Sequence, residues 1–224
     1  MANPRTGIDV VKVLHAEQRL TIHRPLPPAG TVVAKTRVLE VIDKGAERGA
    51  ILITERTLHE KAGGELLCTQ MSSTFCRGNG GFGGSVTASP SPHAMPSSAP
   101  QRSADTRTSR RAALIYRLSG DYNPLHCDPQ TAAAAGFREP ILHGLCSYGI
   151  AARSIIEIFC DGDGDLLRAL DVRFSSPVYP GETLRTEMWS DGSVIAFRTR
   201  VLERDVVVLN HGRAQVGPLA EVRE

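Results

Sequence analysis

Residues 144 to 159 read GLCSYGIAARSIIEIF, and this stretch decides the class of fold. Apolar side chains cover nearly every face of a helix drawn over it, and its charged residues are Arg153 and Glu157. A helix that is apolar all round has to be buried by neighbouring elements, so we expect it to lie against a sheet. Together with the strands described next, this helix predicts an α+β fold, in which an antiparallel sheet wraps around one central helix.

Strands are predicted in both halves of the chain. Two proline-containing turns, at residues 24–31 and 176–183, each contain a glycine and lead into segments rich in β-branched residues. Because each turn is followed by three such segments, each half is expected to end in an antiparallel meander. The six segments are residues 31–43, 50–60, 66–76, 183–191, 194–203 and 206–216.

A second, shorter helix is predicted between Asp128 and Gly136. Asp128 is a typical N-cap, Pro129 suits the first helical position, and Gly136 is a typical stop. The first half has room for a strand or two before its meander, but it contains no comparable helical pattern. We therefore expect the first half to be a partial copy of the second.

Residues 85–110 interrupt the globular pattern. They read SVTASPSPHAMPSSAPQRSADTRTSR, a composition with too few large apolar side chains to offset the entropy of ordering. A glycine-rich turn at residues 78–84 precedes them. The predicted organisation is therefore an N-terminal half over residues 1–84, a linker over 85–110 and a C-terminal half over 111–224.

The composition excludes several classes of protein. Hydrophobic residues make up 41% and charged residues 22%, which is ordinary for a globular domain with a buried core. The net charge is only +2, so neither nucleic acid nor a membrane surface is expected as a partner. No segment approaches about 18 consecutive apolar residues and no signal-peptide pattern opens the sequence, which favours a cytoplasmic location. Five cysteines without C-x-x-C spacing favour reduced thiols.

Two glycine-containing stretches resemble a calcium loop and a phosphate loop but lack required residues, and no metal site is predicted. Residues 161–165 read DGDGD, like the start of a calcium loop, but position twelve of that loop would be Val172 instead of glutamate. The glycine run at residues 78–84 lacks the Lys-Ser/Thr ending of a phosphate loop. Both stretches are better explained as turns.

The segment YRLSGDYNPLH, residues 116–126, gathers polar side chains that suit proton transfer. Asp121 and His126 could hold and polarise one water molecule, because a carboxylate and an imidazole both exchange protons near neutral pH. Asn123 could fix that water or a ligand carbonyl by hydrogen bonding. The residues alone also allow a structural explanation, in which Asp121 and Asn123 satisfy backbone groups of a turn.

Gly144, which follows PILH at residues 140–143, is a second candidate. Its backbone N–H would lie at the start of the long apolar helix, where the helix dipole favours negative charge on a ligand oxygen. Glycine also permits close approach. The alternative is a plain loop-to-helix junction that needs a small residue.

With these motifs in place, the sequence resembles the MaoC-like, R-specific enoyl-CoA hydratase family, and within it the hydratase 2 units of peroxisomal multifunctional enzymes of type 2. The likeness covers nearly the whole chain apart from the linker. It rests on YRLSGDYNPLH, AGF at residues 135–137 and PILHGL at 140–145, and it extends to KVLH at 12–15, RPLP at 24–27, DKG at 43–45, GGFGG at 80–84 and PVYPG at 177–181.

The resemblance implies a double hot dog fold with the active site in the second half. It implies that Asp121 and His126 activate the water, that Asn123 assists, and that the Gly144 N–H binds the thioester oxygen. It also implies that the first hot dog is incomplete, because the relatives carry several dozen further residues before position 1. An incomplete first half is expected to expose a sheet edge and apolar surface.

Substrate contacts are implied for a further set of residues. His15, Ala16 and Lys44 match family positions in the first half, although Ala16 stands where the family has glycine. The set is completed by four residues of the second half: Tyr122, Pro124, Leu125 and Phe174.

The activity implied is hydration of trans-2-enoyl-CoA to (3R)-3-hydroxyacyl-CoA by a hydro-lyase, enoyl-CoA hydratase 2, in fatty acid or sterol side-chain breakdown. No cofactor is expected, since coenzyme A is part of the substrate, and the expected assembly is a homodimer. Two alternatives stay open. One is dehydration of (3R)-hydroxyacyl groups on acyl carrier protein, and the other is a thioester-binding subunit that needs a partner chain.

Overall fold

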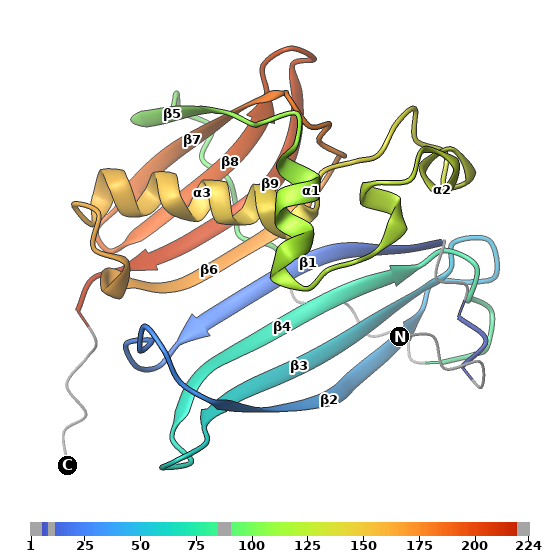
Figure 1. Ribbon diagram of the computed structural model, residues 1–224, viewed down its shortest axis with the longest axis horizontal. Coiled ribbons are helices and arrows are strands. Elements are labelled where there is room, and N and C mark those ends of the chain that lie inside the picture. The colour runs from blue at the N-terminus through green and yellow to red at the C-terminus, as the bar shows by residue number, and fades with distance from the viewer. Residues whose placement is uncertain (1–5, 9–11, 85–90, 219–224) are drawn as a thin grey trace.

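A computed structural model describes residues 6–8, 12–84 and 91–218, and its main element is one nine-stranded sheet with antiparallel neighbours throughout (Figure 1). The strand order is β2-β3-β4-β1-β6-β9-β8-β7-β5. The strands are β1 (Val13–Ile22), β2 (Val32–Asp43), β3 (Ala50–Glu60), β4 (Leu66–Cys76), β5 (Arg102–Arg107), β6 (Leu167–Phe174), β7 (Thr183–Asp191), β8 (Val194–Val201) and β9 (Val206–Val216).

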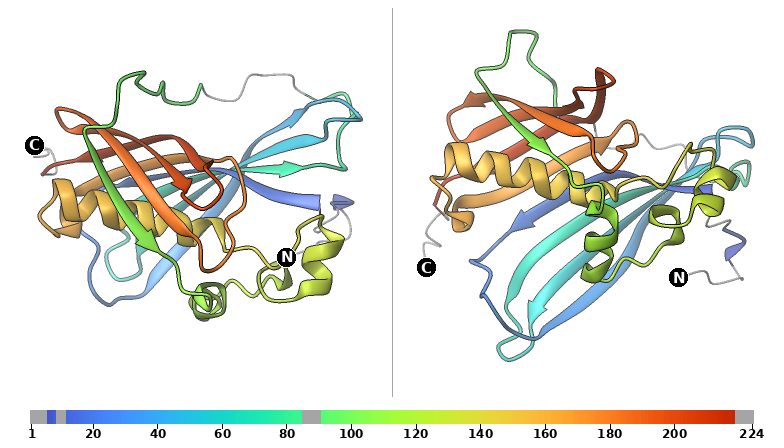
Figure 2. Two further views of the ribbon diagram at one scale, coloured as in Figure 1. Left: turned by 90° about the horizontal axis from the view of Figure 1, so that it is seen from above. Right: turned by 45° about the horizontal axis from the view of Figure 1, so that its top comes forward.

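The long helix α3 (Gly144–Phe159) lies across the sheet of the C-terminal half, which curves around it (Figure 2). Its Ala151 and Ile155 are fully buried, and the Tyr148 hydroxyl donates a hydrogen bond to the Leu170 carbonyl of β6 at 2.6 Å. Burial of an aliphatic side chain of this size is worth about 1.5–3 kcal/mol. The prediction of a buried helix within an antiparallel sheet is therefore confirmed, and so is the α+β class. The strand residues of this core are Leu167, Leu170, Val172, Leu184, Met188, Ile195, Phe197, Val201, Val208, Leu209 and Ala214.

Short helices connect β5 to α3 and carry the signature residues. The α-helices are α1 (Ala112–Tyr116) and α2 (Pro129–Ala134), and the 3-10 helices are η3 (Arg117–Ser119), η4 (Pro124–His126) and, after α3, η5 (Gly164–Leu166). Asp128 caps α2 by accepting from the Gln130 N–H at 3.0 Å, as predicted. None of the described helices combines the length and hydropathy that a membrane crossing requires.

Both predicted meanders are confirmed, as β2-β3-β4 and β7-β8-β9. The two halves join where β1 pairs with β6, from Glu17 opposite Arg173 to Thr21 opposite Ala169. The Arg173 guanidinium donates to the Glu17 carboxylate at 2.6 and 2.9 Å across this seam. The halves thus share one continuous sheet.

The N-terminal half is open, as expected from its composition. Residues 12–84 contain no α-helix, so β1 to β4 have none of their own to cover them. The edge strand β2 leaves an apolar set at least 40% exposed, which confirms the expected exposure of a sheet edge and apolar surface. This set is Val32, Val33, Val38, Leu39 and Val41.

The expected linker extends too far, because residues 102–107 form the edge strand β5. This strand pairs with β7, and the Arg185 guanidinium binds the Asp105 carboxylate through two hydrogen bonds of 2.7 Å. Before β5, the chain is fastened to the sheet by the Trp189 indole, which donates to the Ser98 carbonyl at 2.9 Å. Pairing with β7 supplies the hydrogen bonds that the local composition cannot predict. Residues 85–90 lie outside the described chain.

Candidate active site

The turn between η3 and η4 brings Asp121, Asn123 and His126 together. Asp121 Oδ1 accepts from the Asn123 N–H at 3.2 Å, and Asn123 Oδ1 caps η4 by accepting from the Leu125 N–H at 3.0 Å. The Asp121 side chain is 43% exposed, whereas His126 is buried. The structural role that the sequence allowed for Asp121 and Asn123 is therefore present, and it leaves Asp121 Oδ2 free of hydrogen bonds to the described residues.

His126 is held in one tautomer. Its Nδ1 lies 2.8 Å from the Ile141 carbonyl oxygen, which can only accept, so Nδ1 carries the hydrogen and Nε2 offers a lone pair. Burial lowers the pKa of His126 below its ordinary value of 6.5, against the opposing effects of the Ile141 carbonyl and the Asp121 charge. A neutral imidazole with a free Nε2 can take a proton near neutral pH.

Arg117 fixes the backbone of this turn. Its Nη1 donates to the Tyr122 carbonyl at 3.1 Å and to the Asn123 carbonyl at 3.4 Å. The exposed Tyr122 ring lies over the same guanidinium, 5.5 Å from its carbon. Of the other signature residues expected to contact substrate, Pro124 is exposed and Leu125 is half-buried at the start of η4.

His143 is a residue that sequence reasoning missed. Its ring stacks on that of His126 with 3.7 Å between centroids, and its Nε2 lies 3.2 Å from the Asp121 carbonyl oxygen. Burial, followed by the proximity of His126, lowers the pKa of His143 to about 4. The available signal was its position directly before Gly144 at the start of α3.

Gly144 begins α3, so its N–H has no acceptor within the helix. The Phe174 ring lies against it: a Cβ at Gly144 would be 3.0 Å from Phe174 Cε1 and 3.1 Å from Cδ1. The His15 ring contacts the same phenylalanine, with 4.8 Å between ring centroids. Phe174 thus joins the helix start to the N-terminal half.

A β-bulge explains how His15 reaches this position. Against β4, His15 is opposite Thr74 and Glu17 is opposite Ser73, so Ala16 is the extra residue. Bulges bend a strand and redirect its side chains. His15 is largely buried and burial lowers its pKa, while its Nε2 has no hydrogen-bond partner among the described residues.

A cavity of about 820 Å³ lies between the halves and is lined by three of the predicted substrate residues, Ala16, Lys44 and Phe174. His15 is not part of this lining, but its ring contacts Phe174. The cavity is also lined by Arg48 and Arg77, which sequence reasoning did not select. Its wall combines charged side chains of both signs, with Glu17 and Glu47 among the cations, and the apolar Ile51, Phe75 and Phe174.

The loop that carries Lys44 is held by Asp43. The Asp43 carboxylate accepts from the N–H groups of Gly45 and Gly81 at 2.8 Å and of Gly83 at 2.7 Å. These bonds, with that from Gly81 the strongest cause, lower the pKa of Asp43. The glycine-rich run 78–84 is therefore not a phosphate loop but a strap folded over the end of β2.

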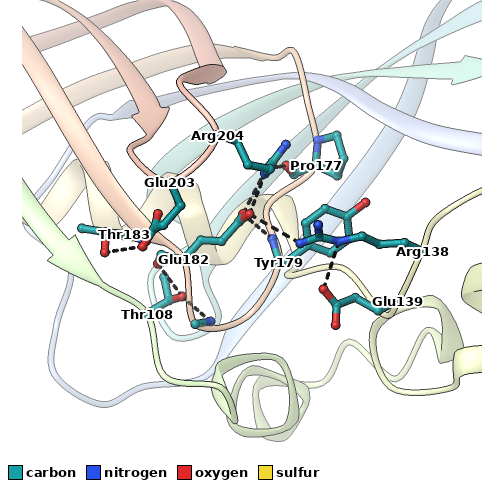
Figure 3. A network of polar contacts seen from close by, with 10 residues as sticks. Thr108, Arg138, Glu139, Pro177, Tyr179, Glu182, Thr183, Glu203 and Arg204 are labelled. Atoms are coloured by element: carbon teal, nitrogen blue, oxygen red, sulfur yellow. Dashed lines mark hydrogen bonds and ion pairs between the residues drawn. The ribbon is translucent and has the colours of Figure 1, made fainter.

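A separate polar network supports the segment before His143 (Figure 3). The carboxylate of the buried Glu182 binds the Arg204 guanidinium and accepts from the Tyr179 N–H, and Arg138 lies over the Tyr179 ring at 4.0 Å. The turn built this way accepts a hydrogen bond at the Val178 carbonyl from the Leu142 N–H, at 2.7 Å. A second cavity, about 440 Å³, lies between this network and His126.

Asp121, His126 and His143 form the one group of potential metal ligands within the described residues. Two of its members suit a metal poorly. The His126 and His143 rings are stacked at 27°, so the lone pairs in the two ring planes run side by side and do not converge on one point. His126 Nδ1 and His143 Nε2 already face carbonyl oxygens.

The chain is similar to known proteins over nearly its whole length. The MaoC like domain matches residues 93–211, and the MFE-2 hydratase 2 N-terminal domain matches residues 2–78. Enoyl-CoA hydratase 2 of Arabidopsis thaliana, named peroxisomal, is 43% identical over 215 residues, which cover 92% of this chain and 69% of the relative. Peroxisomal multifunctional enzyme type 2 of Mus musculus is 40% identical over 98% of this chain. The chain spans only 30% of that larger enzyme.

Solved structures support the fold. A MaoC-like dehydratase from Phytophthora capsici superposes with a TM-score of 0.86 at 38% identity, covering 98% of this chain and 75% of the other. A Mycobacterium tuberculosis protein with a double hot dog fold superposes with a TM-score of 0.57 at 15% identity, covering 92% and 76%. The double hot dog prediction is therefore confirmed, and the chain belongs to the MaoC-like hydratase 2 family.

Proposed function

We propose that the chain is an enoyl-CoA hydratase 2, a hydro-lyase that adds water to trans-2-enoyl-CoA and forms (3R)-3-hydroxyacyl-CoA in fatty acid or sterol side-chain breakdown. The observation that carries this proposal is the free Nε2 of a neutral His126 beside Asp121. The His126 ring stacks on His143, which directly precedes the start of α3. A base, a carboxylate and a free backbone N–H are the groups that this addition requires.

The proposed reaction uses these groups in turn. His126 Nε2 and the Asp121 carboxylate hold a water molecule and accept its proton as its oxygen bonds to C3 of the enoyl group. The electron pair of the double bond moves toward the thioester oxygen, where the Gly144 N–H and the α3 dipole stabilise the enolate-like charge. The same pair of residues returns a proton to C2, so one water is added and no charge is left over.

Asn123 and the cavity residues are proposed to position the substrate. Asn123 Oδ1 is already bonded to the Leu125 N–H, so its amide N–H groups are available to the water or the substrate. The carrier would occupy the cavity lined by Ala16, Lys44 and Phe174, next to His15. Tyr122, Pro124 and Leu125 would contact the substrate at the edge of the signature turn.

No cofactor is proposed, because hydration of an activated double bond neither oxidises nor reduces the substrate. We also propose a homodimer and a cytoplasmic location.

The cysteines are free thiols in this structure, which suits a reducing compartment. Gel filtration with light scattering measures the assembly, and cell fractionation measures the location. The word peroxisomal in the relatives' names belongs to those proteins.

A second candidate, a subunit that needs a partner chain, is favoured by the exposed apolar side chains of β2. The alternative of dehydrating acyl carrier protein substrates uses the same residues in reverse. Both are separated from the main proposal by one set of assays.

The deciding experiment follows the loss of absorbance of the conjugated thioester when the purified chain meets trans-2-enoyl-CoA of short and long chain, with Asp121→Asn as control. Hydration by the wild-type chain that the variant lacks, with a product oxidised only by a 3R-specific dehydrogenase, supports the proposal. Faster turnover on acyl carrier protein would select the alternative carrier. A folded chain without activity would select the partner-dependent subunit.

A further inference from the structure

His143 is buried next to the residues of the proposed reaction. Its side chain is only 2% exposed, with the His126 ring stacked against it and the Tyr116 ring 4.6 Å away between centroids. It is also the N-cap position of α3, directly before Gly144, yet it makes no side-chain capping bond. His143 therefore contacts His126 and lies next to both Asp121 and Gly144.

The hydrogen bond to Asp121 fixes the tautomer of His143. Its Nε2 lies 3.2 Å from the Asp121 carbonyl oxygen, so Nε2 carries the hydrogen and donates it. The same nitrogen is 4.0 Å from Asp121 Oδ2. The other nitrogen, Nδ1, is buried with no hydrogen-bond partner among the described residues. A buried imidazole left half satisfied costs stability, which points to a role for the half that is bonded.

The ring is also neutral at the pH of the reaction. The groups that face it are the His126 imidazole from η4, the Asp121 carboxylate, the Arg117 guanidinium from η3, and Tyr116 from α1. Burial and the neighbouring His126 outweigh the attraction of Asp121, so the pKa of His143 is about 4. His143 therefore contributes shape and one N–H donor to the site, but no charge.

We propose that His143 is a positioning residue, which holds the Asp121 backbone through its Nε2–H and holds the His126 ring by stacking, so that both act on the same water. This inference rests on the proposed hydratase function. His143 itself touches neither water nor substrate, because its free nitrogen is buried and its other nitrogen is occupied. Misplacement of a reacting group by about 1 Å costs on the order of 10²-fold in rate.

Two variants separate the two contacts. His143→Phe keeps a flat ring against His126 and removes the N–H, and we expect it to lower kcat by on the order of 10²-fold with little change in KM. His143→Gln keeps an N–H donor and removes the ring, and we expect kcat to stay within about tenfold of wild type. Tyr116→Phe changes the other ring neighbour without touching either contact, and it serves as the control with near-normal kcat.

The titration of His126 separates the loss of the stacked ring from the loss of the N–H donor. In His143→Gln, water replaces the stacked ring, so the pKa of His126 should rise toward 6.5 and the acid limb of the kcat/KM profile should move up with it. In His143→Phe an aromatic ring still covers His126, so the acid limb of the kcat/KM profile should not move. The pKa of His126 is read directly from the imidazole carbon and nitrogen shifts by NMR, which requires no activity.

The outcomes are distinct. Normal kcat in His143→Phe, or an unchanged His126 pKa in His143→Gln, would overturn the positioning role. If the wild-type chain itself hydrates no enoyl thioester, the proposed function fails, and the NMR titration still decides the role of His143. Thermal unfolding checks that each variant is folded, and His143→Gln carries the test if the phenylalanine variant is not.

Discussion

Phe174 lies so close to Gly144 that a methyl group added to the glycine would come within 3.0 Å of the aromatic ring. The contact joins the last residue of β6 to the first residue of α3. The position therefore needs glycine because of crowding by Phe174, since Gly144 is absent from the positions with positive φ.

Gly144→Ala is expected to lower kcat/KM on the order of 10²-fold. Either the start of α3 or the Phe174 ring must shift to admit the methyl group, and the Gly144 N–H would then no longer point at the thioester oxygen. Gly149→Ala is the matched control on the same helix, since nothing lies within 4 Å of the methyl group it would add. That control should keep its activity and gain about 0.5–1 kcal/mol of stability from helix propensity. Equal activity of the two variants would remove Gly144 from the proposed mechanism.

Asp121→Asn should abolish turnover while leaving thermal unfolding close to wild type, because it removes proton transfer and not core packing. His126→Ala should also abolish turnover, but it should lower the unfolding temperature, because it removes a buried ring and leaves the Ile141 carbonyl without its donor. Steady-state rates and circular dichroism measure the two properties. A variant of either residue with near-normal rates would show that the roles are wrongly assigned.

The pH profile follows from the tautomer and burial of His126. Because burial lowers the pKa of His126, its neutral, proton-accepting form persists below pH 6.5. The acid limb of kcat/KM should accordingly lie below pH 6.5, with activity falling as His126 gains a proton. A limb well above that pH would contradict a buried, neutral base.

Asp43→Asn should raise KM for the acyl-CoA more than it lowers kcat. An amide nitrogen would replace one of the two oxygens that bind Gly45, Gly81 and Gly83, and the strap beside Lys44 would loosen. The pKa of Asp43 is lowered in the folded chain, so this stabilisation is complete above about pH 4 and is lost as pH falls through the folded value. Asp205→Asn, at an exposed acid that does not line the cavity, is the control.

Glu182→Gln should destabilise the chain by about 3–5 kcal/mol, because it leaves the Arg204 guanidinium without its buried partner. Glu139 forms an ion pair with Arg138 in the same network, but its side chain is 53% exposed. Glu139→Gln should therefore lower the free energy of unfolding by at most about 1 kcal/mol. Urea unfolding monitored through Trp189 gives both values. Similar losses in the two variants would mean that burial does not set the strength of this network.

The regular elements are predictable from local pattern. The apolar run of residues 144–159 and the alternation in the two meanders specify α3 and six strands, and the cap at Asp128 specifies α2. β6 was missed although Leu170, Val172 and Phe174 alternate with charged residues, because the strand follows directly on the DGDGD turn. β5 could not be found in the same way, since its only partner is β7, about 80 residues later.

The candidate site also has a part that local sequence predicts and a part that depends on distant segments. The signature turn encodes Asp121, Asn123 and His126 in one short stretch, whereas their alignment depends on His143, which comes from another element. The contact of His15 with Phe174 requires both the bulge at Ala16 and the pairing of β1 with β6. Such contacts between distant segments follow from the sheet register, which local composition does not specify.

The seam between β1 and β6 sets an order of events during synthesis of the chain. Glu17 and Arg173 are 156 residues apart, so at about 5–20 residues per second β1 waits roughly 10–30 s for its second neighbour. During that time β4 can pair with one side of β1, while the other side presents unpaired backbone next to the charged Glu17 and Arg19. Charged side chains on a waiting edge discourage pairing with a second nascent chain. Glu17, which later binds Arg173, would thus first protect the unfinished sheet during synthesis.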